Sequence, residues 1–177
     1  MPKSITRGLV QIYTGDGKGK TTAAIGNIIR ALSHGMKIYV AVFMKDDSSY
    51  GEWDYLAKLP NIKVERFGFR EFCDPHNIKP EEKEQTRRAL NATREATQSG
   101  NYDLVVLDEI NVAVAWHLIE QDEVLKLIEE KPLRLELILT GRYADSEFIK
   151  RADLVTEMLK IKHPFDTGFS ARQGIEF

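Results

Sequence analysis

Thr14-Gly15-Asp16-Gly17-Lys18-Gly19-Lys20-Thr21-Thr22 is the stretch that decides the fold of this chain. It stands between an apolar run typical of a β-strand, residues 9–13, and a run typical of an α-helix, residues 23–32. A glycine-rich turn in that setting directs backbone N–H groups and a helix N-terminus at one point, which attracts polyphosphate. The stretch therefore predicts a binding site for a nucleoside triphosphate.

The loop departs in one place from the phosphate-loop pattern G-x-x-x-x-G-K-[ST]. Counting back from Gly19, the first glycine of the pattern falls on Thr14. Glycines at alternate positions still permit the backbone dihedrals that such a loop requires. Lys20 is expected to reach phosphate oxygens, and the Thr21 hydroxyl to bind Mg²⁺. The alternative is a glycine-rich turn that binds nothing. The candidate ATP-binding residues of the loop are Gly15, Asp16, Gly17, Lys18, Gly19, Lys20, Thr21 and Thr22.

The composition is that of an ordinary globular protein. The 177 residues are 42% apolar and 29% charged, enough for one domain with a sizeable core, and we expect residues 1–177 to form a single domain. A net charge of −2 gives no broad field that would attract nucleic acid. The single cysteine, Cys73, excludes an internal disulfide and fits the cytoplasm. No apolar run is long enough to span a membrane.

Strands and helices are expected to alternate along the chain. Apolar, β-branched runs predict strands over residues 9–13, 38–43, 62–67, 103–108, 133–140 and 153–159. Helices are predicted over residues 21–34, 52–59, 80–99, 120–130 and 145–151, followed by a tail over 160–177. This alternation predicts an α/β fold with a mostly parallel sheet flanked by helices, in the three-layer α/β/α arrangement of a P-loop NTPase of the RecA-like type.

Asp108 and Glu109 close one of the predicted strands. Ligands of parallel sheets bind beyond the carboxyl ends of the strands, where the glycine loop also lies. A carboxylate at this place resembles the Walker B arrangement and can hold Mg²⁺ beside the loop, so Thr21, Asp108 and Glu109 are the candidate metal ligands. The alternative is an acidic pair that faces solvent at the end of a strand.

Other candidate residues have plain structural alternatives. Lys18 adds a positive charge to the loop or is simply solvated, and Arg30 reads from propensity alone as a surface arginine. His163 and Asp166 could touch a ribose or phosphate, or belong to a structured tail. Three phenylalanines around residues 67–72 could face a flat apolar ligand or anchor a loop to the core.

Several segments in the right order together resemble a known family. They are residues 13–24, 30–35, 105–109, 139–142, 152–158, 162–168 and 171–177. The loop, the Thr-Gly-Arg strand end and the Lys-His-Pro-Phe-Asp-Thr-Gly tail in combination are similar to the ATP:corrinoid adenosyltransferases. The resemblance implies transfer of the 5′-deoxyadenosyl group of ATP to the Co(I) atom of a reduced corrinoid, either cobalamin or cobyrinic acid a,c-diamide. Inorganic triphosphate would be the leaving group.

The resemblance also implies residue roles. Lys20, Thr21 and Glu109 would be the catalytic residues, with Asp108 supporting Glu109 at the metal. Arg30 and His163 would contact the nucleotide, and Asp166 would lie toward its nucleoside end. Phe69 and Phe72 are the expected corrinoid contacts. They lie in a stretch where Glu71 stands at the place of a tryptophan found in many family members.

The expected substrates are ATP with Mg²⁺ and a corrinoid, and a flavoprotein reductase is a candidate supplier of Co(I). A homodimer is expected by analogy alone. Three competing functions share the loop: a small-molecule kinase, a nucleotide-dependent switch, and a RecA-like nucleic-acid motor. The chain has no Asn-Lys-x-Asp motif for guanine, which weakens the switch, and its net charge of −2 disfavours the motor.

Overall fold

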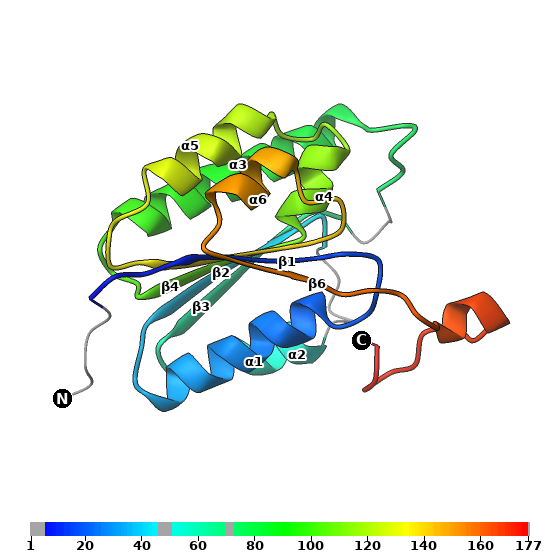
Figure 1. Ribbon diagram of the computed structural model, residues 1–177, viewed down its shortest axis with the longest axis horizontal. Coiled ribbons are helices and arrows are strands. Elements are labelled where there is room, and N and C mark those ends of the chain that lie inside the picture. The colour runs from blue at the N-terminus through cyan, green and yellow to red at the C-terminus, as the bar shows by residue number, and fades with distance from the viewer. Residues whose placement is uncertain (1–5, 46–50, 70–72, 177) are drawn as a thin grey trace.

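The computed structural model describes residues 6–45, 51–69 and 73–176 (Figure 1). In these residues six strands form one sheet, ordered β3-β2-β4-β5-β1-β6, and every described pairing is parallel. The strands are β1 Val10–Thr14, β2 Ile38–Phe43, β3 Ile62–Phe67, β4 Leu104–Asp108, β5 Glu136–Thr140 and β6 Leu154–Glu157. The helices are α1 Lys20–Ser33, α2 Gly51–Leu56, α3 Pro80–Gln98, α4 Ile110–Ala115, α5 Gln121–Glu129, α6 Ser146–Arg151 and the 3₁₀ turn η1 Pro164–Thr167.

The sheet is the middle of three layers, which confirms the predicted α/β class. Helices α1 and α2 cover one face, while α3, α4, α5 and α6 cover the other (Figure 1). Each face has its own apolar core, because successive side chains of a strand point to opposite faces. In β2, for example, Ile38, Val40 and Val42 join the core under α1, and the alternate residues join the core under α3.

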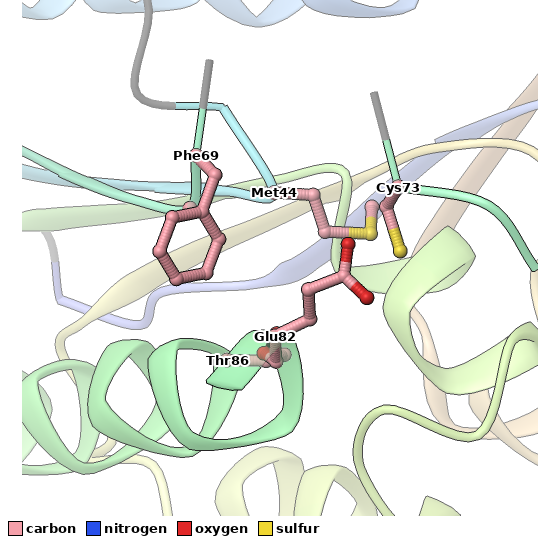
Figure 2. Close-up of a pocket in the computed structure, with 6 residues that line it drawn as sticks. Met44, Phe69, Cys73, Glu82 and Thr86 are labelled. Atoms are coloured by element: carbon pink, nitrogen blue, oxygen red, sulfur yellow. Dashed lines mark hydrogen bonds between the residues drawn. The ribbon is translucent and has the colours of Figure 1, made fainter. Parts of the chain in front are cut away.

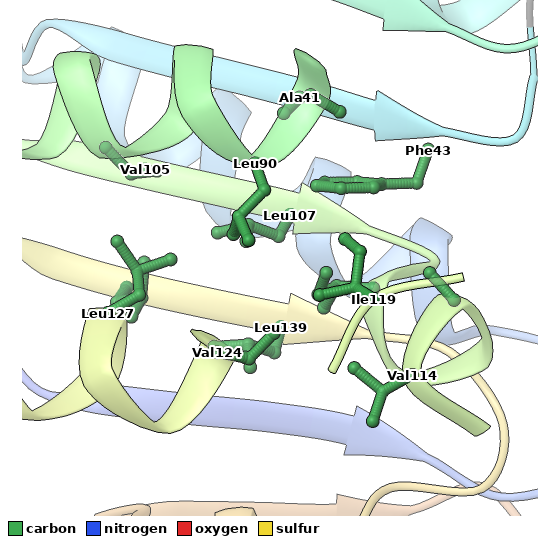
Figure 3. Close-up of a cluster of buried hydrophobic side chains, with 14 of the residues drawn as sticks. Ala41, Phe43, Leu90, Val105, Leu107, Val114, Ile119, Val124, Leu127 and Leu139 are labelled. Carbon is green, nitrogen blue, oxygen red and sulfur yellow. The ribbon is translucent and has the colours of Figure 1, made fainter. Parts of the chain in front are cut away.

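The core under α3, α4 and α5 is the larger of the two clusters. Leu90 of α3, Val114 of α4 and Leu127 of α5 lie over Leu107 and Leu139 of the central strands (Figure 3). Burial on both faces explains why β2 and β4 read as continuous apolar runs: every residue of both strands is buried. The central strands are thereby held firmly, and the loops at their carboxyl ends start from fixed positions.

The predicted elements differ from the structure in a few bounds and in two additions. The strand predicted over 133–140 is limited to β5, because the Leu135 N–H donates to the Pro132 carbonyl in a turn. Helix α4 was not predicted, and neither was η1 within the expected tail. The apolar run of α4 has no polar face, because five of its six residues are buried, so its sequence lacks a helical period. In the described residues, no helix is both long and apolar enough to cross a membrane.

Gly8 tests how tightly the entry to β1 is packed. A Cβ on Gly8 would lie 2.0 Å from the Leu135 carbonyl oxygen, whereas a Cβ on Gly26 of α1 would meet nothing within 4 Å. We expect Gly8→Ala to lower the free energy of unfolding by about 1–3 kcal/mol. Gly26→Ala is expected to raise it by about 0.5–1 kcal/mol, because alanine is the better helix former. Urea unfolding of both variants checks this pair, and a loss of equal size in both would contradict it.

Candidate functional site

The carboxyl ends of four strands meet around one cavity. The cavity has a volume of about 820 Å³ and is lined by the loop after β1, by Lys45 after β2, by Glu109 after β4 and by Arg142 after β5. This is the edge of a parallel sheet at which ligands bind. The glycine loop and the acidic pair, which lie 87 residues apart at Thr21 and Asp108, are joined there by a hydrogen bond. The structure thus brings the two main predicted motifs together.

The glycine loop is held against the end of β6. The Gly17 N–H donates to the Met158 carbonyl at 2.6 Å, and the Met158 N–H donates to the Thr14 carbonyl at 2.8 Å. A Cβ on Gly15 would lie 2.5 Å from the Met158 oxygen, and one on Gly17 would lie 2.7 Å from it. Positions 15 and 17 therefore leave no room for a side chain, because the backbone just after β6 lies against them. Gly19, with φ of 122°, is required by its own dihedral at the start of α1.

Lys20 lies inside the loop. Its ammonium donates to the Gly15 carbonyl at 2.7 Å and to the Gly17 carbonyl at 2.8 Å. Burial lowers the pKa of Lys20, and the nearby Glu109 carboxylate opposes that shift. The side chain is thus held by the loop backbone at the cavity wall, where an ammonium can meet the phosphates of a ligand.

Asp108 is the centre of the polar network. Its carboxylate is completely buried, and Oδ1 accepts hydrogen bonds from the hydroxyls of Thr21 at 2.9 Å and Thr140 at 2.7 Å. Oδ2 lies 3.3 Å from the Lys45 ammonium. A buried carboxylate is stable only where hydrogen bonds and opposite charge compensate its lost hydration. This single group therefore ties α1, β5 and the chain after β2 to the end of β4.

Glu109 turns out of the strand into the cavity. Its φ of 66° is in the left-handed region, which is uncommon for a residue other than glycine, asparagine or aspartate. The Glu109 N–H donates to the Thr140 hydroxyl at 3.0 Å, and its Oε1 lies 3.3 Å from the Lys45 ammonium. The conformation separates the two acids, because Asp108 stays buried and Glu109 lines the cavity. Strained backbone of this kind is often found at functional sites.

The donor set suits a hard divalent cation. Thr21, Asp108 and Glu109, the three predicted metal ligands, supply oxygen atoms of the kind that Mg²⁺ prefers. The described part of the chain holds no cluster of three or more His, Cys, Asp and Glu residues that could bind a metal. In P-loop sites the protein contributes few of the metal's ligands, and the phosphates of the nucleotide contribute others.

The cavity lining combines polar and apolar side chains. Its polar part includes the loop, Lys45, Glu109 and Arg142. Its apolar part, called the apolar wall below, consists of Ile25, Met44, Phe69, Cys73, Val112, Trp116 and Tyr143. One ligand with a charged part and an apolar part, or two ligands side by side, would fit such a lining.

Of the remaining predicted residues that the structure describes, some line the cavity and others do not. Lys18, His163 and Phe69 line the cavity, and the His163 Nδ1 also accepts the Phe165 N–H at the start of η1. Arg30 and Asp166 do not line it. Arg30 is exposed and donates to Asn27 at 3.1 Å, while Asp166 is exposed and paired with Lys160 at 3.0 Å. Phe72 lies outside the described residues. The nucleotide roles of Arg30 and Asp166 stay predictions.

Lys18 is engaged by the end of the chain. Its ammonium lies 2.9 Å from the Ile175 carbonyl oxygen and 3.0 Å from the Glu176 carboxylate, and the last segment returns toward the loop (Figure 1). Arg172 also pairs with Glu176, and these hydrogen bonds lower the pKa of that carboxyl to about 2. Gly174, Ile175 and Glu176 consequently form part of the cavity lining.

The comparisons with known proteins decide the family. The family described as ATP:corrinoid adenosyltransferase BtuR/CobO/CobP matches residues 6–177. This chain belongs to that adenosyltransferase family. A corrinoid adenosyltransferase of Sinorhizobium sp. is 37% identical over 177 residues, with 99% of this chain and 83% of that protein covered. Corrinoid adenosyltransferases of Pseudomonas aeruginosa and Escherichia coli K12 are 35% and 33% identical, with 97% of this chain covered in both and 84% and 86% of those proteins.

Solved structures support the fold of the adenosyltransferase. The KaiC-like protein PH0186 of Pyrococcus horikoshii aligns with a TM-score of 0.51 at 18% identity, over 85% of this chain and 73% of that one. The RadB recombinase aligns with a TM-score of 0.52 at 15% identity, over 89% of this chain and 77% of that one. These likenesses bear on the fold alone, and they agree with the predicted α/β arrangement of a parallel sheet flanked by helices.

Several cavity residues of the adenosyltransferase were not among the predicted ones, and Lys45, Arg142 and Trp116 are examples. Lys45 follows a strand that was predicted, so its place at the carboxyl end was a usable signal. Arg142 belongs to the Thr-Gly-Arg segment and lies 3.9 Å from Asp16. Trp116, directly after α4, has a half-buried side chain that lines the cavity. No spacing in the sequence signals that the chain after α4 reaches this wall.

A small pocket adjoins the apolar wall. Met44, Phe69 and Cys73 line both, and Glu82 and Thr86 of α3 complete the small pocket (Figure 2). The Glu82 carboxylate points toward the sulfur atoms of Met44 and Cys73 (Figure 2). Burial, followed by the negative charge of Glu82, raises the pKa of the Cys73 thiol to about 11.

Cys73 should therefore be a slow nucleophile at neutral pH. At pH 8 we expect iodoacetamide to alkylate it about two orders of magnitude more slowly than glutathione, because only the thiolate reacts. The rate should keep rising toward pH 11, and Glu82→Gln should speed it by lowering the pKa. Mass spectrometry of the intact protein is unambiguous because the chain has one cysteine. An alkylation rate equal to that of glutathione, levelling off near pH 9, would contradict the raised pKa of the Cys73 thiol.

Proposed function

We propose that this adenosyltransferase moves the 5′-deoxyadenosyl group of ATP to the Co(I) atom of a reduced corrinoid. Cobalamin and cobyrinic acid a,c-diamide are the candidate acceptors. The observation that carries the proposal is the pairing, in one cavity of about 820 Å³, of a phosphate loop with an apolar wall. Family membership over residues 6–177 supports the same activity.

The reaction requires placement more than side-chain chemistry. Co(I) donates its electron pair to C5′ as the C5′–O bond breaks, so cobalt is formally oxidised to Co(III) and triphosphate leaves with the electrons of that bond. Because the corrinoid is itself the nucleophile, no serine, cysteine or general base is needed. The protein must hold C5′ in line with cobalt and stabilise the charge of the departing triphosphate.

The described residues suit those two tasks. Lys20 and Arg142 present positive charge to the cavity beside the loop amides and the N-terminus of α1. Thr21, Asp108 and Glu109 would hold Mg²⁺, which supplies Lewis-acid stabilisation of the phosphate charge. Phe69, with Val112 and Trp116, would face the corrinoid, and His163 the nucleotide.

Further parts of the proposal concern the setting of the enzyme. Residues 1–177 would form one nucleotide-binding domain, which the single six-stranded sheet supports. A cytoplasmic reaction with a flavoprotein reductase as source of Co(I) would suit a substrate as reactive as reduced corrinoid. The exposed residues of β6 and of the tail, among them Ile161 and Phe165, would suit a homodimer contact.

The activity is tested with purified protein, ATP, Mg²⁺ and chemically reduced cob(I)alamin under anaerobic conditions. We expect light-sensitive adenosylcobalamin, followed by absorbance, and triphosphate in equal amount. Hydrolysis of ATP to ADP should be slow, because the reaction needs no water at the γ-phosphate. Lys20→Met should lower kcat/KM by about 10²–10³-fold. Lys126→Met, on the exposed face of α5, should leave it unchanged.

Two results would contradict the proposal. Binding of ATP without adenosylation of either cobalamin or cobyrinic acid diamide would exclude the transferase. Rapid hydrolysis to ADP in the absence of corrinoid would favour a kinase or a nucleotide-dependent switch. A third result, equal activity of the Lys20→Met and Lys126→Met variants, would refute only the role assigned to Lys20 and would leave the proposed activity standing.

A further inference from the structure

Lys45 bridges the two acidic residues at the end of β4. Its ammonium lies 3.3 Å from Asp108 Oδ2 and 3.3 Å from Glu109 Oε1. The Lys45 side chain is 20% exposed and lines the cavity. The ammonium thus lies against both carboxylates that we assign to the divalent cation, and it comes from the chain after β2, not from β4.

The backbone of Lys45 is closely packed, while its side chain borders the cavity. Met44 has a left-handed φ of 59°, and a Cβ on Gly68 would lie 2.6 Å from the Lys45 nitrogen, so the ends of β2 and β3 pack closely. The four-carbon stem of the lysine is flexible by comparison, and its compact charge can change partners. Rotation of that stem would bring the ammonium further into the cavity that it lines.

We propose that Lys45 is a built-in counterion that competes with the divalent cation for Asp108 and Glu109. Two cations on the same carboxylate oxygens repel one another, so a metal ion must displace the ammonium to bind there. The contact with Lys45 also compensates the completely buried charge of Asp108. This inference rests on the proposed metal role of these two acids.

The same cavity gives the displaced ammonium a new partner. The phosphates of a nucleotide on the loop would lie in the cavity that Lys45 lines, and an ammonium is a good phosphate binder. Entry of the nucleotide thereby releases Asp108 and Glu109 for the cation. Lys45 would be a positioning residue that makes metal binding depend on the nucleotide, and it takes no part in bond making.

The test is Mn²⁺ binding to the nucleotide-free protein, measured by electron paramagnetic resonance of the unbound ion. We expect Lys45→Met to bind Mn²⁺ at least about tenfold more tightly than the wild type, because a competing unit charge is removed. Lys45→Arg keeps the charge and should match the wild type. Lys126→Met removes an equal charge from exposed α5 and should also match it. A purely structural role for Lys45 would instead weaken binding in the Met variant.

Each other outcome overturns the inference. These are unchanged or weaker Mn²⁺ binding by Lys45→Met, equally tight binding by Lys45→Arg, and an equal gain in Lys126→Met. Circular dichroism establishes that each variant is folded, and Lys45→Gln, with the same expectation, replaces a Met variant that is not. The proposed function is judged separately, from adenosylcobalamin formation by the wild type with ATP, Mg²⁺ and cob(I)alamin. If that activity is present but Mn²⁺ binding does not tighten, only the inference fails.

Discussion

A single buried carboxylate, that of Asp108, organises this protein's polar edge. It is fully removed from water at the end of a central strand, and burying a charge without partners is costly. Thr21 at the start of α1, Thr140 at the end of β5 and Lys45 after β2 supply those partners. Because the three groups come from separate elements, the need to satisfy Asp108 brings the phosphate loop and two strand ends to one point.

The second constraint is the contact between the loop and β6. The backbone at Met158 accepts from Gly17 and lies where side chains on Gly15 or Gly17 would be, so the loop shape is fixed by the sheet. A preformed loop, an acidic residue turned into the cavity at Glu109 and an apolar wall together suit a reaction in which two substrates are aligned. For an adenosyltransferase whose acceptor is the nucleophile, such alignment is the main catalytic task.

Much of this arrangement could be predicted from the sequence, and the remainder has physical reasons for being missed. Continuous apolar runs identified β2 and β4, the glycines with Lys20 identified the loop, and the acidic pair at the end of a predicted strand identified Asp108 and Glu109. Helix α4 was missed because a short helix buried nearly all round has no polar period. The contacts of Lys45 and the return of Glu176 to Lys18 depend on tertiary packing between distant segments, which local pattern does not encode. Propensity alone indicated a surface position for Arg30, and its side chain is exposed and donates to Asn27 outside the cavity lining.

Asp108→Asn is the most direct test of the account, because it keeps the shape of the side chain and removes its charge. Isothermal titration with ATP and Mg²⁺ should show at least about tenfold weaker binding, since the carboxylate orients Thr21 and compensates Lys45. Glu136→Gln, which changes a carboxylate bonded to Leu9 and Gln11 at the entry to β5, should bind ATP like the wild type. If Asp108→Asn binds ATP and forms adenosylcobalamin as well as the Glu136→Gln control, Asp108 does not organise the site.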